Sequence, residues 1–142
     1  MSTTDIRQSL QAIFDGLANR DGSRFIDSLA DDVNWTIIGH NSWSGTFRGK
    51  EAVLRDLLTP LRRLLVERSR TVASRIIVDG DVAAVEARGH NVTRPGARYD
   101  NEYCFVFRFA GGKIAEVTEY SDTELIVSAL GDRAAVLAAR GD

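Results

Sequence analysis

Glu119 is the residue whose type and surroundings most clearly suggest chemistry in this chain of 142 residues. In the segment 113–120, the two-residue period of a strand places Ala115, Val117 and Glu119 on one face. A carboxylate that follows two apolar residues is either buried or located where that face ends in solvent. Burial would raise its pKa unless a cation lay beside it, and would make it a candidate general base.

A second group of ionisable side chains lies in the segment 82–93, where Glu86, Arg88 and His90 share one face. Alternation alone makes this charged face the solvent-exposed one. In the alternative arrangement, Arg88 would bond both Glu86 and Glu119, because its planar guanidinium can bind two carboxylates. One carboxylate would then be a general base, and Arg88 would hold its partner and a developing oxyanion. Such a network can also be purely structural.

The two histidines offer further candidates. His90 could titrate near neutral pH, or be an ordinary strand residue near a turn. His40 lies in the glycine-rich loop 39–49, which could form the roof of a pocket, or it lies on the surface. Because the histidines are far apart and Cys104 is the only cysteine, the sequence argues against a metal site. No cofactor is expected.

Aromatic residues are expected to shape the interior. Asn101, Tyr103, Phe105 and Phe107 share one face of the segment 99–109 by the same period. Most such aromatics form core, but the polar groups of Asn101 and Tyr103 need partners that a ligand or water could supply. The residues expected to line a pocket are Trp35, Ile37, Asn101, Tyr103, Phe105 and His40, with Trp43 as a further shaping residue.

The N-terminal half is predicted to be mainly helical. Thr4 is predicted to cap the start of the first helix, and the stretch 19–22 ends it. A shorter helix follows, then a strand from Val33 to Ile38 and the loop 39–49. A helix starts again at Glu51, with a kink or restart at Thr59-Pro60. Apolar residues at three- and four-residue spacing mark the first helix: Ile6, Leu10, Ile13, Phe14 and Leu17.

The C-terminal half is predicted to be mainly sheet. Segments near 71–79, 82–93, 99–109 and 113–120 are separated by short turns, so successive strands should pair antiparallel. The S-x-x-E pattern of Ser121 and Glu124 predicts the start of a further helix. Helices followed by a long antiparallel sheet indicate a single α+β domain over residues 1–142, with a cavity between the two layers.

Composition narrows the function classes. With 44% hydrophobic and 27% charged residues the chain is globular, and its net charge of −2 gives no electrostatic reason to bind nucleic acid or a membrane. The only basic cluster lacks interleaved aromatics and is interpreted as a solvated face: Arg62, Arg63, Arg68, Arg70 and Arg75. The first fifteen residues show no signal peptide, so the expected location is the cytoplasm.

The order of these elements and several short segments resemble the nuclear transport factor 2-like (SnoaL-like) superfamily, over residues 5 to 131. The resemblance implies a cone-shaped, strongly curved, mostly antiparallel sheet wrapped around N-terminal helices and enclosing a pocket. The superfamily includes isomerases, polyketide cyclases, epoxide hydrolases, dehydratases and members without catalysis, so the fold leaves the reaction open. The segments that carry the resemblance are 29–33, 47–53, 105–109, 112–114 and 119–122.

Two known mechanisms can be compared residue by residue. Proteins similar to ketosteroid isomerase need carboxyl groups at positions that fall near Ile37 and Phe105, and neither residue can transfer a proton. In proteins similar to limonene epoxide hydrolase, an Arg-x-Asp pair corresponds to Glu86 and Arg88 in reversed order. Their second aspartate corresponds to Glu119.

The same comparison places the water-binding tyrosine and asparagine of those hydrolases at Trp35 and Ile37, so that function is lost. It also implies that the face carrying Glu86, Arg88 and His90 looks into the pocket, which is the opposite of what alternation alone favours. Some dehydratases of the superfamily use a pocket histidine, for which His90 is the candidate.

The leading hypothesis is a cofactor-free enzyme that performs acid/base chemistry on a small apolar or aromatic oxygenated metabolite. Its reaction would be of the isomerase, dehydratase, cyclase or hydrolase type, with Glu119, Arg88, Glu86 and His90 as the catalytic residues. The second hypothesis is a non-catalytic binding protein, motivated by Ile37 and Phe105. The third is an assembly domain that associates through the outer face of its sheet, and a homodimer is expected in any case.

Overall fold

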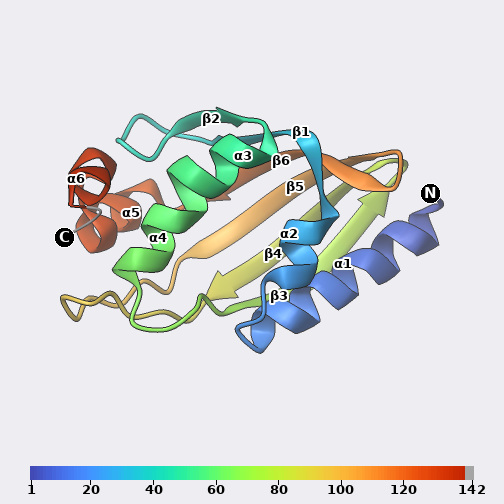
Figure 1. Ribbon diagram of the computed structural model, residues 1–142. Coiled ribbons are helices and arrows are strands. Elements are labelled where there is room, and N and C mark those ends of the chain that lie inside the picture. Colours follow the sequence, from blue (N-terminus) through green and yellow to red (C-terminus); the bar gives the residue numbers. More distant parts are fainter. Residues whose placement is uncertain (140–142) are drawn as a thin grey trace.

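A six-stranded sheet, half surrounded by helices, makes up the computed structural model, which describes residues 1–139 (Figure 1). The last three residues of the expected domain, 140–142, lie outside the described residues. Helices α1 (Thr3–Ala18) and α2 (Ser23–Ser28) come first, and α5 (Thr123–Leu130) and α6 (Arg133–Ala138) come last. None of the described helices is both long and apolar enough to cross a membrane.

Between these helices lie the strands and one further helical stretch. The strands are β1 (Leu29–Ile37), β2 (Gly45–Arg48), β3 (Thr71–Asp79), β4 (Val82–Gly89), β5 (Glu102–Ala110) and β6 (Lys113–Ser121). The helical stretch consists of α3 (Lys50–Ala52), the π-helical segment η1 (Val53–Leu58) and α4 (Thr59–Leu64).

The strand order is β2-β1-β6-β5-β4-β3, and each neighbouring pair is antiparallel except β1 and β6, which are parallel. The α+β class, the curved, mostly antiparallel sheet and the meander from β3 to β6 are therefore confirmed. The parallel pair has a direct consequence for the interior. It places Trp35 beside Val117 and Ile37 beside Glu119, so residues from opposite ends of the chain become neighbours.

Two helices begin at residues other than those predicted. Ser2, not Thr4, caps α1, in a reciprocal arrangement with Asp5 that satisfies two free N–H groups. Asp122, not Ser121, caps α5, because its carboxylate accepts hydrogen bonds from the N–H groups of Glu124 and Leu125. The S-x-x-E pattern thus predicted a helix start correctly to within one residue, and Ser121 remains the last residue of β6.

The region from Gly39 to Leu64 differs from the prediction in two ways. The short strand β2 forms within the expected loop, where Thr46 and Phe47 pair with Thr36 and Trp35 of β1. The expected kink near Pro60 takes the form of π-helical turns in η1 immediately before it. Proline has no N–H and its ring clashes with the carbonyl of a preceding helical turn, so a regular helix cannot continue through it.

The core lies between the sheet and the helices. In Figure 1, α1 runs along the β3 side of the sheet, α3 and α4 run along the β1–β2 side, and α5 and α6 lie at one end. The five apolar residues predicted for the inner stripe of α1 are all buried. Trp43 joins the loop after β1 to the end of α5, because its indole Nε1 donates a hydrogen bond to the carbonyl of Gly131 at 2.9 Å.

Asn101 joins the start of β5 to the turn after β6. Its side chain is fully buried, and its Oδ1 accepts hydrogen bonds from the N–H groups of Glu102 at 2.8 Å and Asp122 at 3.1 Å. Its Nδ2 donates to the carbonyl of Asp122 and to the hydroxyl of Tyr99. All these partners belong to the protein, so Asn101 holds the frame of the cavity and does not offer a group to a ligand.

We expect Asn101→Ala to lower the free energy of unfolding by about 2–4 kcal/mol, because it leaves buried backbone and side-chain groups without partners. Urea denaturation monitored by circular dichroism measures this change. Asn34→Ala is the matched control, since the side chain of Asn34 is only partly buried and makes no hydrogen bond among those described. Its expected effect is within about 0.5 kcal/mol. Equal losses in both variants would contradict the structural role of Asn101.

Candidate functional site

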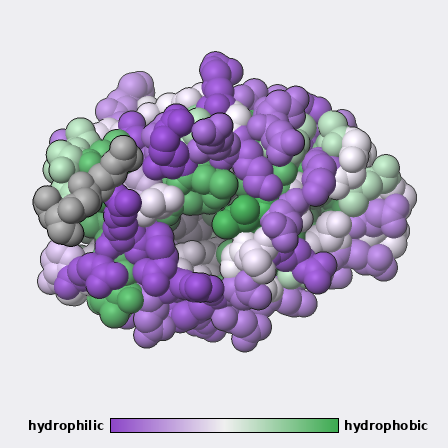
Figure 2. Space-filling model, viewed as in Figure 1, coloured by the Kyte–Doolittle hydropathy of each residue, from purple (hydrophilic) through white to green (hydrophobic). Residues whose placement is uncertain are grey.

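A cavity of about 80 Å³ lies between the inner face of the sheet and the helices. Figure 2 shows a hollow in the middle of the helical face, with hydrophobic residues inside and hydrophilic side chains around the rim. Four of the described lining residues carry a hydroxyl or carboxyl group: Thr71, Tyr99, Tyr103 and Glu119. The other lining residues are Leu17, Phe25, Trp35, Ile37, Trp43, Leu57, Leu58, Leu61, Phe105, Ile126 and Leu130.

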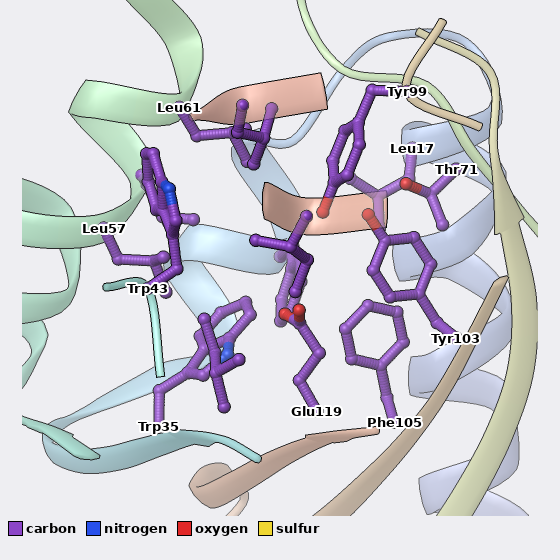
Figure 3. A pocket seen from close by; sticks show the side chains of 15 residues that line it. Leu17, Trp35, Trp43, Leu57, Leu61, Thr71, Tyr99, Tyr103, Phe105 and Glu119 are labelled. Atoms are coloured by element: carbon purple, nitrogen blue, oxygen red, sulfur yellow. The ribbon is translucent and has the colours of Figure 1, made fainter. Parts of the chain in front are cut away.

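Glu119 is the only carboxylate among the described residues that line this cavity, and it is 8% exposed. Figure 3 shows its carboxylate turned into the cavity between Trp35 and Phe105. No lysine, arginine or histidine is among the described lining residues. Burial without a cation disfavours the ionised form and raises the pKa of Glu119 from 4.5 to about 7. The carboxyl group therefore exchanges its proton near neutral pH.

Two tyrosines lie across the cavity from Glu119 (Figure 3). Burial, followed by the charge of Glu119, raises the pKa of Tyr99 to about 12. Burial and the neighbouring Tyr99 and Glu119 raise the pKa of Tyr103 well above 10.0. Tyr103 keeps some accessible surface even though its hydroxyl is enclosed by these neighbours. Both phenols thus stay protonated and can donate hydrogen bonds at neutral pH.

The oxygen of Tyr99 accepts a hydrogen bond from Nδ2 of Asn101 at 3.3 Å, and the hydroxyl of Tyr103 lies close enough to affect its pKa. The orientation of the Asn101 amide is determined, because its Oδ1 accepts from two backbone N–H groups and its Nδ2 must therefore donate. Because Asn101 donates to its oxygen, the hydroxyl proton of Tyr99 remains available for another acceptor. Tyr99 is therefore a candidate donor for a ligand oxygen in the cavity.

Two further buried donors flank the carboxylate: Nε1 of Trp35 on the β1 side, where Trp35 pairs with Val117, and Oγ of Ser121 toward Tyr103. Neither donor has a partner in residues 1–139 at the distance and angle of a regular hydrogen bond. Both nevertheless lie close enough to Glu119 to lower its pKa, against the larger effect of burial. The two donors come from different strands. Trp35 belongs to β1, and Ser121 follows Glu119 by two residues on the same face of β6.

The predicted network of Glu86, Arg88 and Glu119 does not form. Glu86 binds Arg75 of β3 on the outer face of the sheet, and Arg88 lies 3.9 Å from Glu102 on that same face. The side chains of Glu86 and Arg88 are 47% and 59% exposed. Glu119, in contrast, faces the cavity. The sheet itself therefore separates the two groups of charges.

Strand alternation explains this separation. Ala83, Val85 and Ala87 of β4 are buried against the core, so the residues between them face outward. The pattern alone favoured this orientation, and the comparison with epoxide hydrolases reversed it wrongly. A one-residue shift in register moves every side chain of a strand to the opposite face. An alignment that rests on the spacing of the turns is therefore not sufficient to decide which side chains face the cavity.

The remaining predicted residues are divided between the cavity and other regions. Trp35, Ile37, Tyr103 and Phe105 line the cavity as expected. His40 is exposed, and Trp43, three residues later in the same loop, takes the place in the cavity wall. His90 lies in a separate surface cleft that also contains three arginines, Arg20, Arg70 and Arg98. No three metal-ligating side chains gather anywhere in residues 1–139.

Three polar residues of the site had not been selected from the sequence: Tyr99, Thr71 and Ser121. A signal for Tyr99 was available, because it precedes Asn101 and Tyr103 at the same two-residue spacing. Thr71 begins β3 and is the only residue of that strand that lines the cavity, which the local sequence does not show. Ser121 had been interpreted as a helix cap, although Asp122 takes that role.

The raised pKa of Glu119 predicts how stability depends on pH. The folded protein binds its proton more tightly than the unfolded chain does, so stability is lost as the pH rises from 4.5 to about 7 and stays low above it. Glu119→Gln removes this loss. Its free energy of unfolding should exceed that of the wild type by about 3 kcal/mol at pH 8 and by almost nothing at pH 4. Chemical denaturation across this range measures the difference.

The control for this measurement is Glu116→Gln. Glu116 lies on the same strand but faces outward and binds Arg108 at 3.0 Å. A difference between Glu119→Gln and wild type that stays constant from pH 4 to pH 8 would show that Glu119 titrates normally.

The fold and cavity can be compared with known proteins. A family model described as the SnoaL-like domain matches residues 10–117. No curated protein sequence matches this chain significantly. An NTF2-like protein of unknown function from Burkholderia pseudomallei is 20% identical with a TM-score of 0.75, over 92% of this chain and 98% of that one. A likeness at this identity shows the fold alone.

Two further solved structures have comparable similarity. A protein assigned as a SnoaL-like polyketide cyclase from Jannaschia is 16% identical, with a TM-score of 0.72 over 90% of this chain and 92% of that chain. TerC, co-crystallised with polyporic acid, is 19% identical, with a TM-score of 0.73 over 91% and 98%. Since the family model spans about three quarters of the sequence, the chain belongs to the SnoaL-like domain family.

Proposed function

We propose that this protein is a cofactor-free enzyme that binds a compact, mainly apolar, oxygenated metabolite and transfers a proton with Glu119. The observation that carries the proposal is a buried carboxyl group without a cation, in a cavity that is otherwise apolar and aromatic. A general base is most effective when its pKa lies near the working pH, and the pKa of Glu119 is about 7. The name of the Jannaschia relative, a SnoaL-like polyketide cyclase, agrees with this class of chemistry.

The supporting geometry divides the work between two sides of the cavity. A ketone bound with its oxygen toward Tyr99 would direct the neighbouring C–H group toward Glu119. The carboxylate accepts that proton, while the Tyr99 hydroxyl donates a hydrogen bond to the oxygen as it becomes an enolate. Glu119 then returns the proton to the substrate at the same or another atom. Isomerisation, dehydration and aldol-type cyclisation all begin with this step.

The volume of the cavity limits the substrate. Pockets for drug-sized ligands typically measure about 300–1,000 Å³, whereas this cavity measures about 80 Å³. A larger substrate therefore requires part of the wall to move. Helix α4 and segment η1 supply three leucines of that wall, Leu57, Leu58 and Leu61, and the π-helical turns lack regular α-helical hydrogen bonding. This stretch is the part of the wall best suited to adjust.

Proton transfer can be tested without knowledge of the natural substrate. Cyclohexanone is a compact apolar ketone whose α-protons exchange with deuterium in D₂O, and proton NMR follows the exchange. We expect the wild-type protein to accelerate exchange, with a rate that rises with pH through about 7 as Glu119 ionises. Glu119→Gln should reduce the acceleration at least about a hundredfold, and Tyr99→Phe about tenfold or more.

Glu116→Gln again serves as control and should exchange cyclohexanone as fast as wild type. If Glu119→Gln retains the full acceleration, the carboxylate is not the base and the proposal is wrong. If the ketone binds, as seen from line broadening, but no variant accelerates exchange, the cavity serves binding only. That second function is favoured by Ile37 and Phe105, which occupy the positions where the isomerases carry carboxyl groups.

A homodimer is the proposed assembly. Ile77, Ala84, Val106 and Thr118 form a row across β3, β4, β5 and β6, on the face of the sheet opposite the cavity. Ile77 is 51% exposed, and Tyr120 nearby on β6 is 46% exposed. Apolar surface of this kind on the open face of a sheet is characteristic of a region covered by a partner. A second copy of the chain is the natural partner, because it supplies the same surface.

We expect the wild type to sediment as a dimer in analytical ultracentrifugation and Val106→Asp to sediment as a monomer, because the introduced charge would be buried between two sheets. Val127→Asp is the control, since Val127 is 50% exposed on α5, away from this face. A wild-type protein that sediments only as a monomer excludes this assembly.

A further inference from the structure

Trp35 and Ser121 present an unusual feature of the cavity. Both place a buried hydrogen-bond donor beside Glu119, and neither donor has a partner in residues 1–139. An unsatisfied buried donor costs about 1–3 kcal/mol, so two of them on either side of one carboxylate require a reason. Folded proteins pair the great majority of their buried polar atoms.

Three groups could satisfy these donors: a ligand, a water molecule or Glu119 itself. Nε1 of Trp35 and Oγ of Ser121 have almost no accessible surface, including surface that faces the cavity. A ligand oxygen or a water molecule therefore cannot reach either atom without moving the side chains around it. The carboxylate of Glu119 already lies beside both, and Figure 3 shows the nitrogen of Trp35 on the side that faces it.

The strand register makes this arrangement stable. Parallel pairing of β1 and β6 places Ile37 beside Glu119 and Trp35 beside Val117, so the indole of Trp35 comes from the adjacent strand on the same face. Ser121 follows Glu119 by two residues and also faces inward, next to Tyr103 of β5. The donors are thus attached to two hydrogen-bonded strands, and their distance from the carboxylate can change only slightly.

We propose that Trp35 and Ser121 are positioning residues whose donors are reserved for the ionised form of Glu119. A neutral carboxyl group is a weak acceptor and leaves the two donors loosely engaged, whereas a carboxylate attracts both and closes two charge-assisted hydrogen bonds. The proposal deepens the function proposed above, because it concerns the same acid/base group and its value for catalysis rests on that function.

The consequence is a balance between two opposing effects on the pKa of Glu119. Burial raises it, and the donors of Trp35 and Ser121 lower it. The other ionisable groups that face Glu119 from the described lining are Tyr99 of the segment before β5 and Tyr103 of β5, and both stay neutral near pH 7. Without the donor pair, the carboxyl group would keep its proton well above neutral pH and be a poor base.

The donor pair also decides how a substrate lies. Because Glu119 itself uses the donors of Trp35 and Ser121, a substrate oxygen must find its donor among the hydroxyl groups of the lining, such as that of Tyr99. The substrate class that fits has one acceptor oxygen next to an acidic C–H group, with apolar surface elsewhere. A ligand with charged groups at both ends would leave one of them against the apolar wall.

The test measures the ionisation of Glu119 directly. Infrared difference spectra between a protein and its Glu119→Gln counterpart isolate the carboxylic C=O band of Glu119, and its intensity against pH gives the midpoint. We expect Trp35→Phe and Ser121→Ala each to raise the midpoint by about one pH unit or more, since each removes a hydrogen bond to a charged group. The double variant should raise it further.

Trp43→Phe is the matched control. Trp43 lines the same cavity and is equally buried, but its Nε1 donates to the carbonyl of Gly131 at 2.9 Å. The Trp43→Phe substitution removes the same atoms as Trp35→Phe. If the proposal is correct, it leaves the midpoint of the Glu119 titration unchanged. Ser121→Thr keeps a hydroxyl and should restore the midpoint of wild type.

Two results would overturn the proposal: unchanged or lowered midpoints in both Trp35→Phe and Ser121→Ala, or an equal rise in Trp43→Phe. Should Trp35→Phe not fold, the comparison of Ser121→Ala with Ser121→Thr is sufficient alone.

The outcome of this test can be separated from the outcome of the test of the proposed function. If Glu119→Gln abolishes ketone exchange while the midpoints stay fixed, only the donor pair fails. If the midpoints shift but wild-type protein exchanges no ketone, only the catalytic function fails.

Discussion

The burial of one carboxylate governs the arrangement of polar groups in this protein. An ionised group in an apolar interior costs several kcal/mol unless it is paired or hydrogen-bonded, and Glu119 has no cation among the described residues that line its cavity. The cavity compensates with neutral donors: Trp35 on the neighbouring strand β1, Ser121 further along β6 beside Tyr103, and the two tyrosine hydroxyls. Neutral donors reduce the cost without removing it. The carboxyl group is thereby left able to gain and lose its proton near neutral pH.

Much of the fold follows from local patterns. The inner stripe of α1, the four strands from β3 to β6 and the α+β class were all predictable, because apolar period and turn residues report local geometry. The strand β2 was not predictable, since a four-residue strand on the edge of a sheet has too few residues for a pattern. The parallel pairing of β1 with β6 was also not visible, because it depends on how distant segments meet.

Some residues of the candidate site could be predicted from the sequence and others could not. Glu119, Trp35, Ile37, Tyr103 and Phe105 could be placed at the cavity by alternation and resemblance, and the structure confirms that location. Glu86 and Arg88 could not, because the two arguments disagreed about which face of β4 is inside. Alternation reports burial, which is a physical property of this chain. An alignment transfers positions between proteins whose chemistry differs, and here burial was the better guide.

The bond between Trp43 and Gly131 has a consequence for how the cavity is made during synthesis. The loop that carries Trp43 is translated before β6 and α5, which supply Glu119, Ile126 and Leu130. Domains synthesised on the ribosome cannot make contacts with residues that have not yet emerged. The parallel partner of β1 is therefore missing until β6 has been synthesised. The buried carboxylate and helix α5, which supplies Ile126 and Leu130 to the cavity wall, are adjacent in the sequence and become available together.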